Sequence, residues 1–295
     1  MAVLDVIQTP AFQQRFFFLA KRFIAGETVD QAMDAVAGIN AQGMSATLDF
    51  LGEDVTTREE AVRTRDAYAA LLAAIRARNV ETNVSVKLTA LGLLVDEDFA
   101  LENLRAILEA ASHNRDPFVR IDMEGSAVTD ATLRVFERAY AETRNVGPVL
   151  QAYLKRTQAD VERMVALGAR VRLCKGAYSE PPTIAYTDMA TIRREYLRCA
   201  ETLLERGNYP GLATHDPRLI AGVETFAGER TIARNRFEFQ MLYGVRPELQ
   251  RRLVADGYRV RIYVPYGTHW AGYFYRRITE RRENALFALR SLFWR

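Results

Sequence analysis

Residues 259–283 read RVRIYVPYGTHWAGYFYRRITERRE, and the way this stretch divides indicates the fold. Apolar side chains alternate with polar and aromatic ones over 260–264, a period of two that is typical of a strand. Pro265 and Gly267 then interrupt the run, and a helix is predicted to begin near Thr268. A strand followed closely by a helix is the repeating unit of α/β proteins.

The same unit recurs along the chain. Strand-like runs lie at 45–51, 83–89, 118–124, 149–154, 170–177, 211–216, 236–242 and 259–265. Helical patterns follow them at 57–78, 97–113, 130–143, 158–167, 184–206, 219–227, 247–256 and beyond 268. Eight alternations over roughly 230 residues favour a closed parallel barrel over an open doubly wound sheet. No G-x-G-x-x-G or Walker loop occurs, so an open nucleotide-binding sheet lacks its usual signature.

Residues 1–44 precede this pattern and are predicted to form a helical segment packed on the barrel. Residues 45–295 are predicted to be the barrel itself, in a single domain. Thr28 is expected to cap a helix that ends near Gly43. The Phe-rich segment 12–24 is interpreted as packing across the end of the domain, and contact with a membrane surface or a partner is the alternative.

Composition excludes several classes of protein. Hydrophobic residues make up 49% of the 295-residue chain and charged residues 26%, which is ordinary for a globular protein with a sizeable core. The net charge of +3, without a basic stripe, argues against nucleic-acid binding. Two cysteines without metal-ligand spacing predict neither a metal site nor a disulfide framework. The sequence has no secretory signal and no apolar run of 18 residues, so a soluble, cytoplasmic protein is expected.

Polar and ionisable residues gather where the predicted strands end. In a parallel barrel these ends meet at one rim, which is where active sites form. A structural ion pair between Lys87 and Asp122, a loop histidine at His215 and a backbone hydrogen bond from Gln151 are the alternatives for single positions. The residues at the predicted rim are Asp49, Lys87, Asp122, Glu124, Gln151, Lys155, Arg172, Lys175, Thr214, His215, Gln240 and Tyr263.

The predicted last helix carries a second cluster of charge. Tyr273, Arg276, Arg277 and Glu280 are spaced to share one face, and two guanidiniums braced by a carboxylate form a good receptor for a small carboxylate. The alternative is an exposed helix that carries intrahelical ion pairs.

Eight motifs together resemble the monofunctional bacterial proline dehydrogenases, flavoenzymes that open proline catabolism. The resemblance runs from about residue 26 to the C-terminus. It implies a distorted (βα)8 TIM-type barrel that binds FAD, with the last helix across the barrel mouth. In order, the motifs are VSVKLTALG, RIDME, LQAYLKR, RVRLCKGAY, ATHD, FEFQMLYG, RIYVPYG and YFYRRITERREN.

The resemblance also implies which residues meet the substrate. Arg276 and Arg277 would bind its carboxylate, and Glu280 would brace the arginine pair. Tyr263 and Tyr273 would wall the proline ring.

Further roles follow from the same resemblance. Lys87 would contact the substrate and pair with Asp122, and Asp122 and Arg172 would be the catalytic residues. A cation such as Arg172 or Lys175 beside reduced flavin would raise its reduction potential. The residues implied to hold FAD are Met123, Gln151, Arg172, Lys175, Gly176, Ala177, Thr214 and His215.

The implied reaction oxidises L-proline to Δ1-pyrroline-5-carboxylate by hydride transfer to flavin N5, and a quinone then accepts the electrons. The product would pass to a pyrroline-5-carboxylate dehydrogenase, and weak peripheral contact with the membrane is compatible with a quinone acceptor. The competing hypotheses are a Schiff-base aldolase that uses Lys175, a hydroxyproline oxidase, and a membrane-associated scaffold that uses the N-terminal segment.

Overall fold

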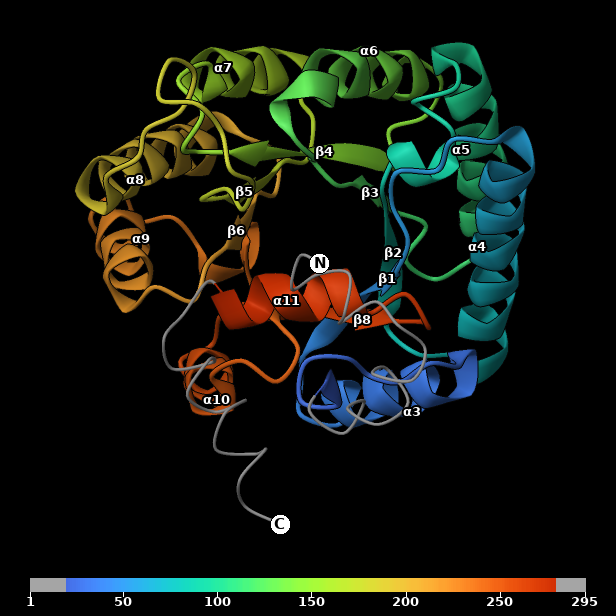
Figure 1. The fold of residues 1–295 in the computed structure, drawn as a ribbon. Helices are drawn as coiled ribbons and strands as arrows, with labels where there is room; N and C mark the ends of the chain where they lie inside the picture. Colours follow the sequence, from blue (N-terminus) through green and yellow to red (C-terminus); the bar gives the residue numbers. More distant parts are fainter. Residues whose placement is uncertain (1–19, 280–295) are drawn as a thin grey trace.

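The computed structural model describes residues 20–279, and within this part the strands form one closed barrel (Figure 1). Each strand is parallel to both of its neighbours, and their order around the barrel is their order in the chain. The predicted barrel is therefore confirmed. Its strands are β1 (Ser45–Phe50), β2 (Thr82–Val86), β3 (Val119–Ile121), β4 (Val146–Gln151), β5 (Arg172–Cys174), β6 (Gly211–Ala213), β7 (Glu238–Leu242) and β8 (Arg259–Tyr266).

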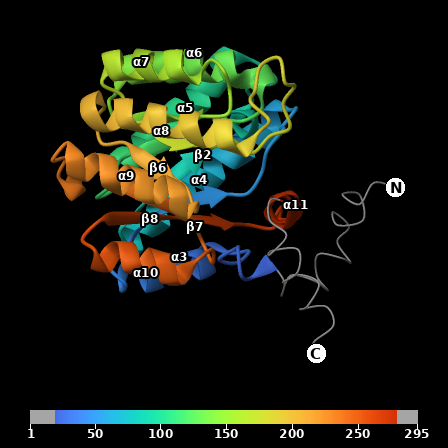
Figure 2. The same ribbon diagram turned by 90° about the vertical axis from the view of Figure 1, so that its left-hand side faces the viewer.

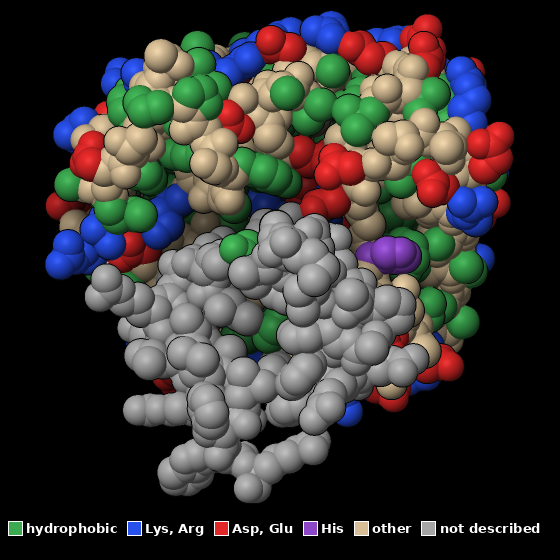
Figure 3. Space-filling model, in the orientation of Figure 1, with side chains coloured by type: hydrophobic (Ala, Val, Ile, Leu, Met, Phe, Trp, Pro, Cys, Tyr) green, Lys and Arg blue, Asp and Glu red, His purple; other side chains and the backbone are tan. Residues whose placement is uncertain are grey.

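A ring of helices surrounds the strands, and one further helix lies across the mouth of the barrel (Figure 1). Seen from the side, α11 (Ala271–Thr279) sits beyond the end of β8, as expected for the last helix (Figure 2). Lys, Arg, Asp and Glu side chains interleave around the rim of this face (Figure 3). The surrounding helices are α3 (Val29–Asn40), α4 (Arg58–Arg78), α5 (Glu97–Ser112), α6 (Ser126–Glu142), α7 (Thr157–Leu167), α8 (Met189–Arg206), α9 (Pro217–Glu229) and α10 (Pro247–Ala255).

Local sequence explains where most helices begin. The Thr28 side chain accepts from the backbone N–H of Gln31, and the Gln31 side chain accepts from that of Thr28, which closes a capping box on α3. Thr57 and Asp96 also cap α4 and α5, each accepting one backbone N–H, from Glu60 and Phe99 respectively. The α3 face of Ala32, Met33, Val36 and Ile39 is buried.

Two helices begin four or five residues away from their predicted starts, for reasons outside their own apolar pattern. Helix α6 begins four residues earlier than predicted, at Ser126, whose backbone N–H and hydroxyl both donate to the Glu180 carboxylate. Helix α8 begins at Met189 and not at 184, because the backbone N–H of Ala185 is bonded to Pro181 in a turn and Asp188 supplies the cap.

The barrel interior is polar, whereas the apolar strand residues pack outward against the helices. Hydrogen bonds between strands that are not neighbours, such as Arg172 on β5 to Ser85 on β2, cross this interior. The interior can therefore hold charge, provided that every group finds a partner. Its buried polar side chains include Thr47, Asn83, Ser85, Arg120, Arg172, Glu238, Gln240 and Arg261.

A separate apolar cluster anchors α11 over the mouth. Phe23 and Ile24 are 1% exposed and belong to the same cluster as Trp270 and Phe274. The Phe23 and Phe274 ring centroids lie 6.5 Å apart. Packing of the N-terminal segment across the end of the domain is thus present for residues 20–24. Residues 1–19 lie outside the described part, and the division of the chain after residue 44 stays a prediction.

No helix in the described part of the chain combines the length and the apolar character that crossing a membrane requires. Between residues 20 and 279 there is also no group of three or more His, Cys, Asp and Glu side chains arranged to hold a metal ion.

Candidate active site

A cavity of about 490 Å³ opens at the carboxyl-terminal ends of the strands, where parallel barrels place their active sites. The rim residues Asp49 and Gln240 line the cavity, and so does every residue that the resemblance assigns to substrate, catalysis or cofactor and whose side chain the structure describes. The residues assigned in this way are Lys87, Asp122, Met123, Gln151, Arg172, Lys175, Gly176, Ala177, Thr214, His215, Tyr263 and Tyr273.

Three predicted substrate contacts fall where side chains are not described. Arg276 and Arg277 belong to the backbone of α11, but their side chains lie outside the described set. Glu280 lies beyond the described residues altogether. The roles of these three residues stay predictions.

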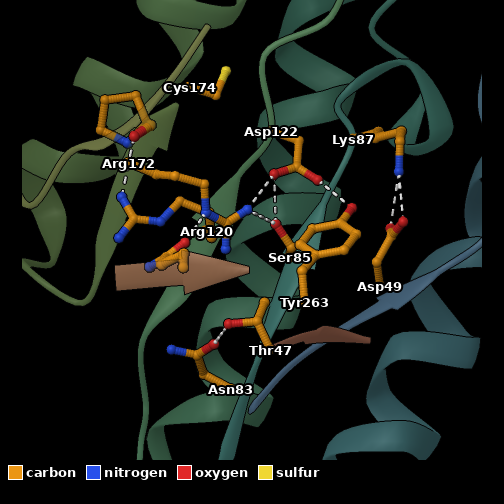
Figure 4. Close-up of polar contacts among 12 residues, drawn as sticks. Thr47, Asp49, Asn83, Ser85, Lys87, Arg120, Asp122, Arg172, Cys174 and Tyr263 are labelled. Atoms are coloured by element: carbon orange, nitrogen blue, oxygen red, sulfur yellow. Dashed lines mark hydrogen bonds and ion pairs between the residues drawn. The ribbon is translucent and has the colours of Figure 1, made fainter. Parts of the chain in front are cut away.

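Lys87 pairs with Asp49 and not with Asp122, so that predicted ion pair is wrong. The Lys87 Nζ lies 2.9 Å from both carboxylate oxygens of Asp49 (Figure 4). Burial disfavours the charged ammonium, but the negative charges of Asp49 and Asp122 outweigh it and raise the pKa of Lys87. Lys87 therefore stays protonated at neutral pH.

Asp122 is a hydrogen-bond hub beside the cavity (Figure 4). Its Oδ1 accepts from Ser85 Oγ at 2.7 Å and from Arg172 Nη1 at 2.8 Å, and its Oδ2 accepts from Tyr263 Oη at 2.7 Å. Burial, with the nearby charges of Asp122 and Asp49, raises the pKa of Tyr263 well above its usual value. The phenol therefore remains a donor, and Arg172 and Tyr263 are held in fixed positions around one carboxylate.

The part of the cavity that follows β5 has cationic side chains next to a glycine whose backbone packs tightly against a tyrosine ring. Lys175 Nζ lies 3.6 Å from Asp216 Oδ2, which also accepts from Arg193 Nε at 2.7 Å. Burial opposes ionisation of Asp216, but the Arg193 hydrogen bond and the neighbouring cations outweigh it and lower its pKa. Gly176 has φ +123°, and a Cβ there would lie 2.1 Å from the Tyr153 ring, so only glycine fits.

These residues fit an anionic cofactor with a flat aromatic ring. Met123, Val149 and Met241 supply an apolar wall, while Arg172 and Lys175 supply positive charge on the same cavity. FAD has both the ring and the phosphates that this lining suits.

Two residues of the predicted rim turn away from the cavity. Lys155 is exposed, and its Nζ donates to the carbonyl of Pro182 at 2.8 Å. The Glu124 carboxylate accepts from both the backbone N–H and the hydroxyl of Thr89. The backbone hydrogen bond suggested as the alternative for Gln151 is present, since Gln151 Nε2 donates to Glu124 O. His215 also has a hydrogen-bond partner, because Leu242 N donates to its Nε2.

Several lining residues gave no signal in the sequence. Most are apolar side chains at strand ends or at the start of α8, where core packing and ligand contact call for the same residue types. The lining residues missed in this way are Val149, Tyr153, Tyr178, Met189, Ile192, Ala213, Met241, Leu242 and Val245.

The buried Glu124 carboxyl predicts a pH-dependent stability. Burial raises its pKa to about 7 from the ordinary 4.5, although the bonds from Thr89 oppose this. The folded state therefore binds the proton more tightly, and stability present below pH 4.5 is lost as pH rises to about 7. The loss is about 3 kcal/mol, from roughly 1.4 kcal/mol per pKa unit.

Replacing Glu124 by Gln should remove this loss. We expect urea unfolding to show E124Q more stable than the parent at pH 8, with the difference shrinking towards pH 4.5. An equal difference at both pH values would contradict a titrating Glu124.

Comparison with known proteins places the chain in a family. The family model described as proline dehydrogenase matches residues 32–290. The chain is 40% identical over 273 residues to proline dehydrogenase 1 of Bacillus subtilis (strain 168), which covers 92% of this chain and 90% of that protein. It is 39% identical over 300 residues to the proline dehydrogenase of Deinococcus radiodurans, and this match covers 99% of this chain and 96% of that protein.

A solved structure of a larger protein shares the fold. Proline utilization A from Bdellovibrio bacteriovorus, inactivated by N-propargylglycine, superposes with a TM-score of 0.83 at 28% identity. The match covers 90% of this chain and 33% of that protein.

Proposed function

This chain belongs to the proline dehydrogenase family, and we propose that its cavity binds L-proline and oxidises it to Δ1-pyrroline-5-carboxylate. One observation carries the proposal. The residues of the family motifs, scattered from Lys87 to Tyr273 along the chain, converge on one cavity at the active end of the barrel.

FAD is the cofactor of this family, and when bound it supplies the acceptor for the hydride that leaves the ring carbon beside nitrogen. We assign its binding to Met123, Gln151, Lys175, Gly176, Ala177, Thr214 and His215, with Arg172. The Arg172 guanidinium is fixed on one side by Asp122, so its charge faces the cavity without having to reorganise during the reaction.

The substrate is oriented from the mouth. Helix α11 lies across it, and Arg276 and Arg277 are proposed to bind the carboxylate of proline. Tyr263 on β8 and Tyr273 on α11 itself line the cavity and would enclose the ring, which excludes water from the reacting carbon. The Tyr263 hydroxyl donates to Asp122, and this hydrogen bond fixes the tyrosine ring. The fixed ring would crowd a hydroxyl on the substrate, so proline is preferred over hydroxyproline.

Neither Lys87 nor Tyr263 can take the amine proton, because the pKa of each is raised and both keep their own protons at neutral pH. We infer that proline loses this proton to solvent before the ring is enclosed. A quinone is inferred as the final electron acceptor, and a pyrroline-5-carboxylate dehydrogenase as the enzyme that receives the product.

An aldolase that uses Lys175 is disfavoured by its surroundings. A Schiff base forms on a neutral amine, whereas the Asp216 carboxylate lies 3.6 Å from this ammonium and favours its charged form.

Weak contact with a membrane through the N-terminal segment is a separate proposal. Liposome flotation should compare the intact chain with one lacking residues 1–19, because residues 20–24 pack against α11. Equal flotation would exclude a lipid contact made by residues 1–19.

An absorption spectrum tests the reaction directly. The purified protein should be yellow, and anaerobic L-proline should bleach the flavin band. A colourless protein whose lysine is trapped by borohydride with a carbonyl substrate would replace the proposal with the aldolase.

Arg276→Met should raise the KM for proline more than tenfold, because a charge-assisted bidentate contact contributes about 2–4 kcal/mol. Steady-state kinetics with varied proline will measure this. Arg105→Met, at an exposed arginine on α5 that pairs with Glu142, is a matched control with an expected KM close to that of the parent. An unchanged KM in Arg276→Met would remove this residue from the site.

A further inference from the structure

A row of hydrogen-bonded side chains runs from Arg172 and Gln240, which line the cavity, into the barrel interior. Arg172 Nε on β5 donates to Gln240 Oε1 on β7, and Gln240 Nε2 donates to Glu238 Oε1 at 2.5 Å. Arg261 Nε on β8 donates to the same Glu238 oxygen at 2.8 Å. The row therefore joins the cavity residue Arg172 to groups near the opposite end of the barrel.

The donors and acceptors of this row can be arranged in only one way. Arginine donates and cannot accept, so Gln240 presents its oxygen to Arg172 and its amide N–H to Glu238. Burial opposes ionisation of Glu238, but Arg261 and the bonds from Gln240 and Arg261 outweigh it and lower its pKa. The carboxylate is thus ionised, and it fixes the Gln240 amide in the orientation that Arg172 needs.

The sequence leaves space for this amide. A Cβ at Gly211 on β6 would lie 2.4 Å from Gln240 Nε2 and 2.8 Å from its Cδ. Gly211 does not have a positive φ, so the absence of a side chain serves the approach of Gln240 and not the backbone conformation.

Arg172 is therefore held at two points. Its Nη1 is bonded to Asp122 and Ser85 on the cavity side, and its Nε to Gln240 on the interior side. With bonds at Nη1 only, the guanidinium could rotate about that atom. The bond from Nε to Gln240 fixes the plane of the guanidinium. Arg172, Gln240 and Glu238 are no more than 5% exposed, so water does not replace a lost contact.

We propose that Gln240 and Glu238 are positioning residues that hold the Arg172 guanidinium towards the cofactor from inside the barrel. The proposal rests on the proposed function, because it takes Arg172 to favour the reduced, negatively charged flavin. This effect requires no contact of Glu238 with proline, and it acts through the hydrogen bond from Arg172 Nε to Gln240 Oε1.

Gln240→Met tests the proposal, because methionine fills a similar volume without accepting from Arg172. The flavin midpoint potential should fall, with a tenfold weaker preference for the reduced cofactor corresponding to about 30 mV for a two-electron couple. We expect kcat to fall more than about fivefold and the KM for proline to change less than about twofold. Potentiometric titration of the purified holoenzyme and steady-state kinetics provide the two readouts.

Gln158→Met is the matched control, since Gln158 is a half-buried glutamine between α7 and α8 that bonds Thr202. It should leave both the potential and kcat unchanged. Gly211→Ala displaces the Gln240 amide without altering any member of the row, and it should shift the potential in the same direction as Gln240→Met.

Some outcomes would overturn the proposal. A lower Tm in Gln240→Met with an unchanged potential and kcat would mean that the row only stabilises the barrel. A rise in KM with an unchanged kcat would mean that Gln240 acts on the substrate. Failure of the parent protein to bleach with proline would instead contradict the proposed function, so the two failures are distinguishable.

Discussion

Replacing Asp122 by Ala should lower kcat/KM for proline by about 10²- to 10³-fold, the largest effect we expect at any single position. Three donors lose their acceptor at once, namely the Ser85 hydroxyl, the Arg172 guanidinium and the Tyr263 hydroxyl. Arg172 then lacks the carboxylate that holds it in the cavity lining, and breaking such a buried pair costs about 3–5 kcal/mol of stability. Kinetics, with urea unfolding as the second readout, will measure both effects.

Ser85→Ala is the matched control for Asp122→Ala. It removes one neutral donor from the same carboxylate, together with the 3.2 Å contact from Arg172 Nη1 to Ser85 Oγ, and leaves the bonds from Arg172 and Tyr263 to Asp122 in place. We expect its effect on kcat/KM to stay below about tenfold, since one neutral hydrogen bond contributes about 1 kcal/mol. Equal losses in the two variants would show that the Asp122 charge is not what the site requires.

Lys87→Met should destabilise the protein by about 3–5 kcal/mol at neutral pH and abolish most of its activity. Burial already raises the pKa of Asp49, which is 1% exposed, and loss of the Lys87 ammonium raises it further. The folded state then favours the protonated acid, so the loss of stability should be small below the ordinary pKa of 3.8 and grow as pH rises. Chemical unfolding of the parent and the variant across this pH range gives the measurement.

The double variant Lys87→Met with Asp49→Asn separates stability from catalysis. Removing both charges should restore most of the stability lost at neutral pH, because no uncompensated carboxylate remains inside the barrel. Activity should stay low if Lys87 contacts the substrate as proposed. Full recovery of activity would mean that Lys87 serves only to neutralise Asp49.

The sequence predicted the barrel because its signals are local. Alternating apolar runs, with Thr28 and Thr57 as helix caps, depend on residues a few positions apart. The early start of α6 was missed because its cap comes from Glu180, 54 positions away along the chain. The residue pattern of the helix itself cannot predict a partner that lies so far away in the sequence.

The sequence predicted which residues gather at the rim of the barrel, but it did not predict which of them form ion pairs. The parallel strands place Lys87, Asp122, Arg172 and Tyr263 at one rim of the barrel. This placement does not depend on which side chains pair with one another. Lys87 lies between β1 and β3 and could reach a carboxylate on either side, so its choice of Asp49 depends on the stagger of the strands.

The supporting residues behind the site were largely overlooked. Ser85 on β2 and Glu238 on β7 come two positions before Lys87 and Gln240 in the chain and lie inside the barrel, where an apolar residue is the usual expectation. Polar residues at every second position of an otherwise apolar strand are the signal that would have found them.

Pairing of the first strand with the last has a consequence for biosynthesis. β1 joins β8 through six residue pairs, from Ser45 with Arg261 to Phe50 with Tyr266. During translation β8 leaves the ribosome after the other seven strands of the barrel, so the nascent chain keeps an open β1 edge until β8 has been made. Chains that terminate before Arg259 should therefore associate with chaperones or aggregate, because their β1 edge has no β8 to pair with.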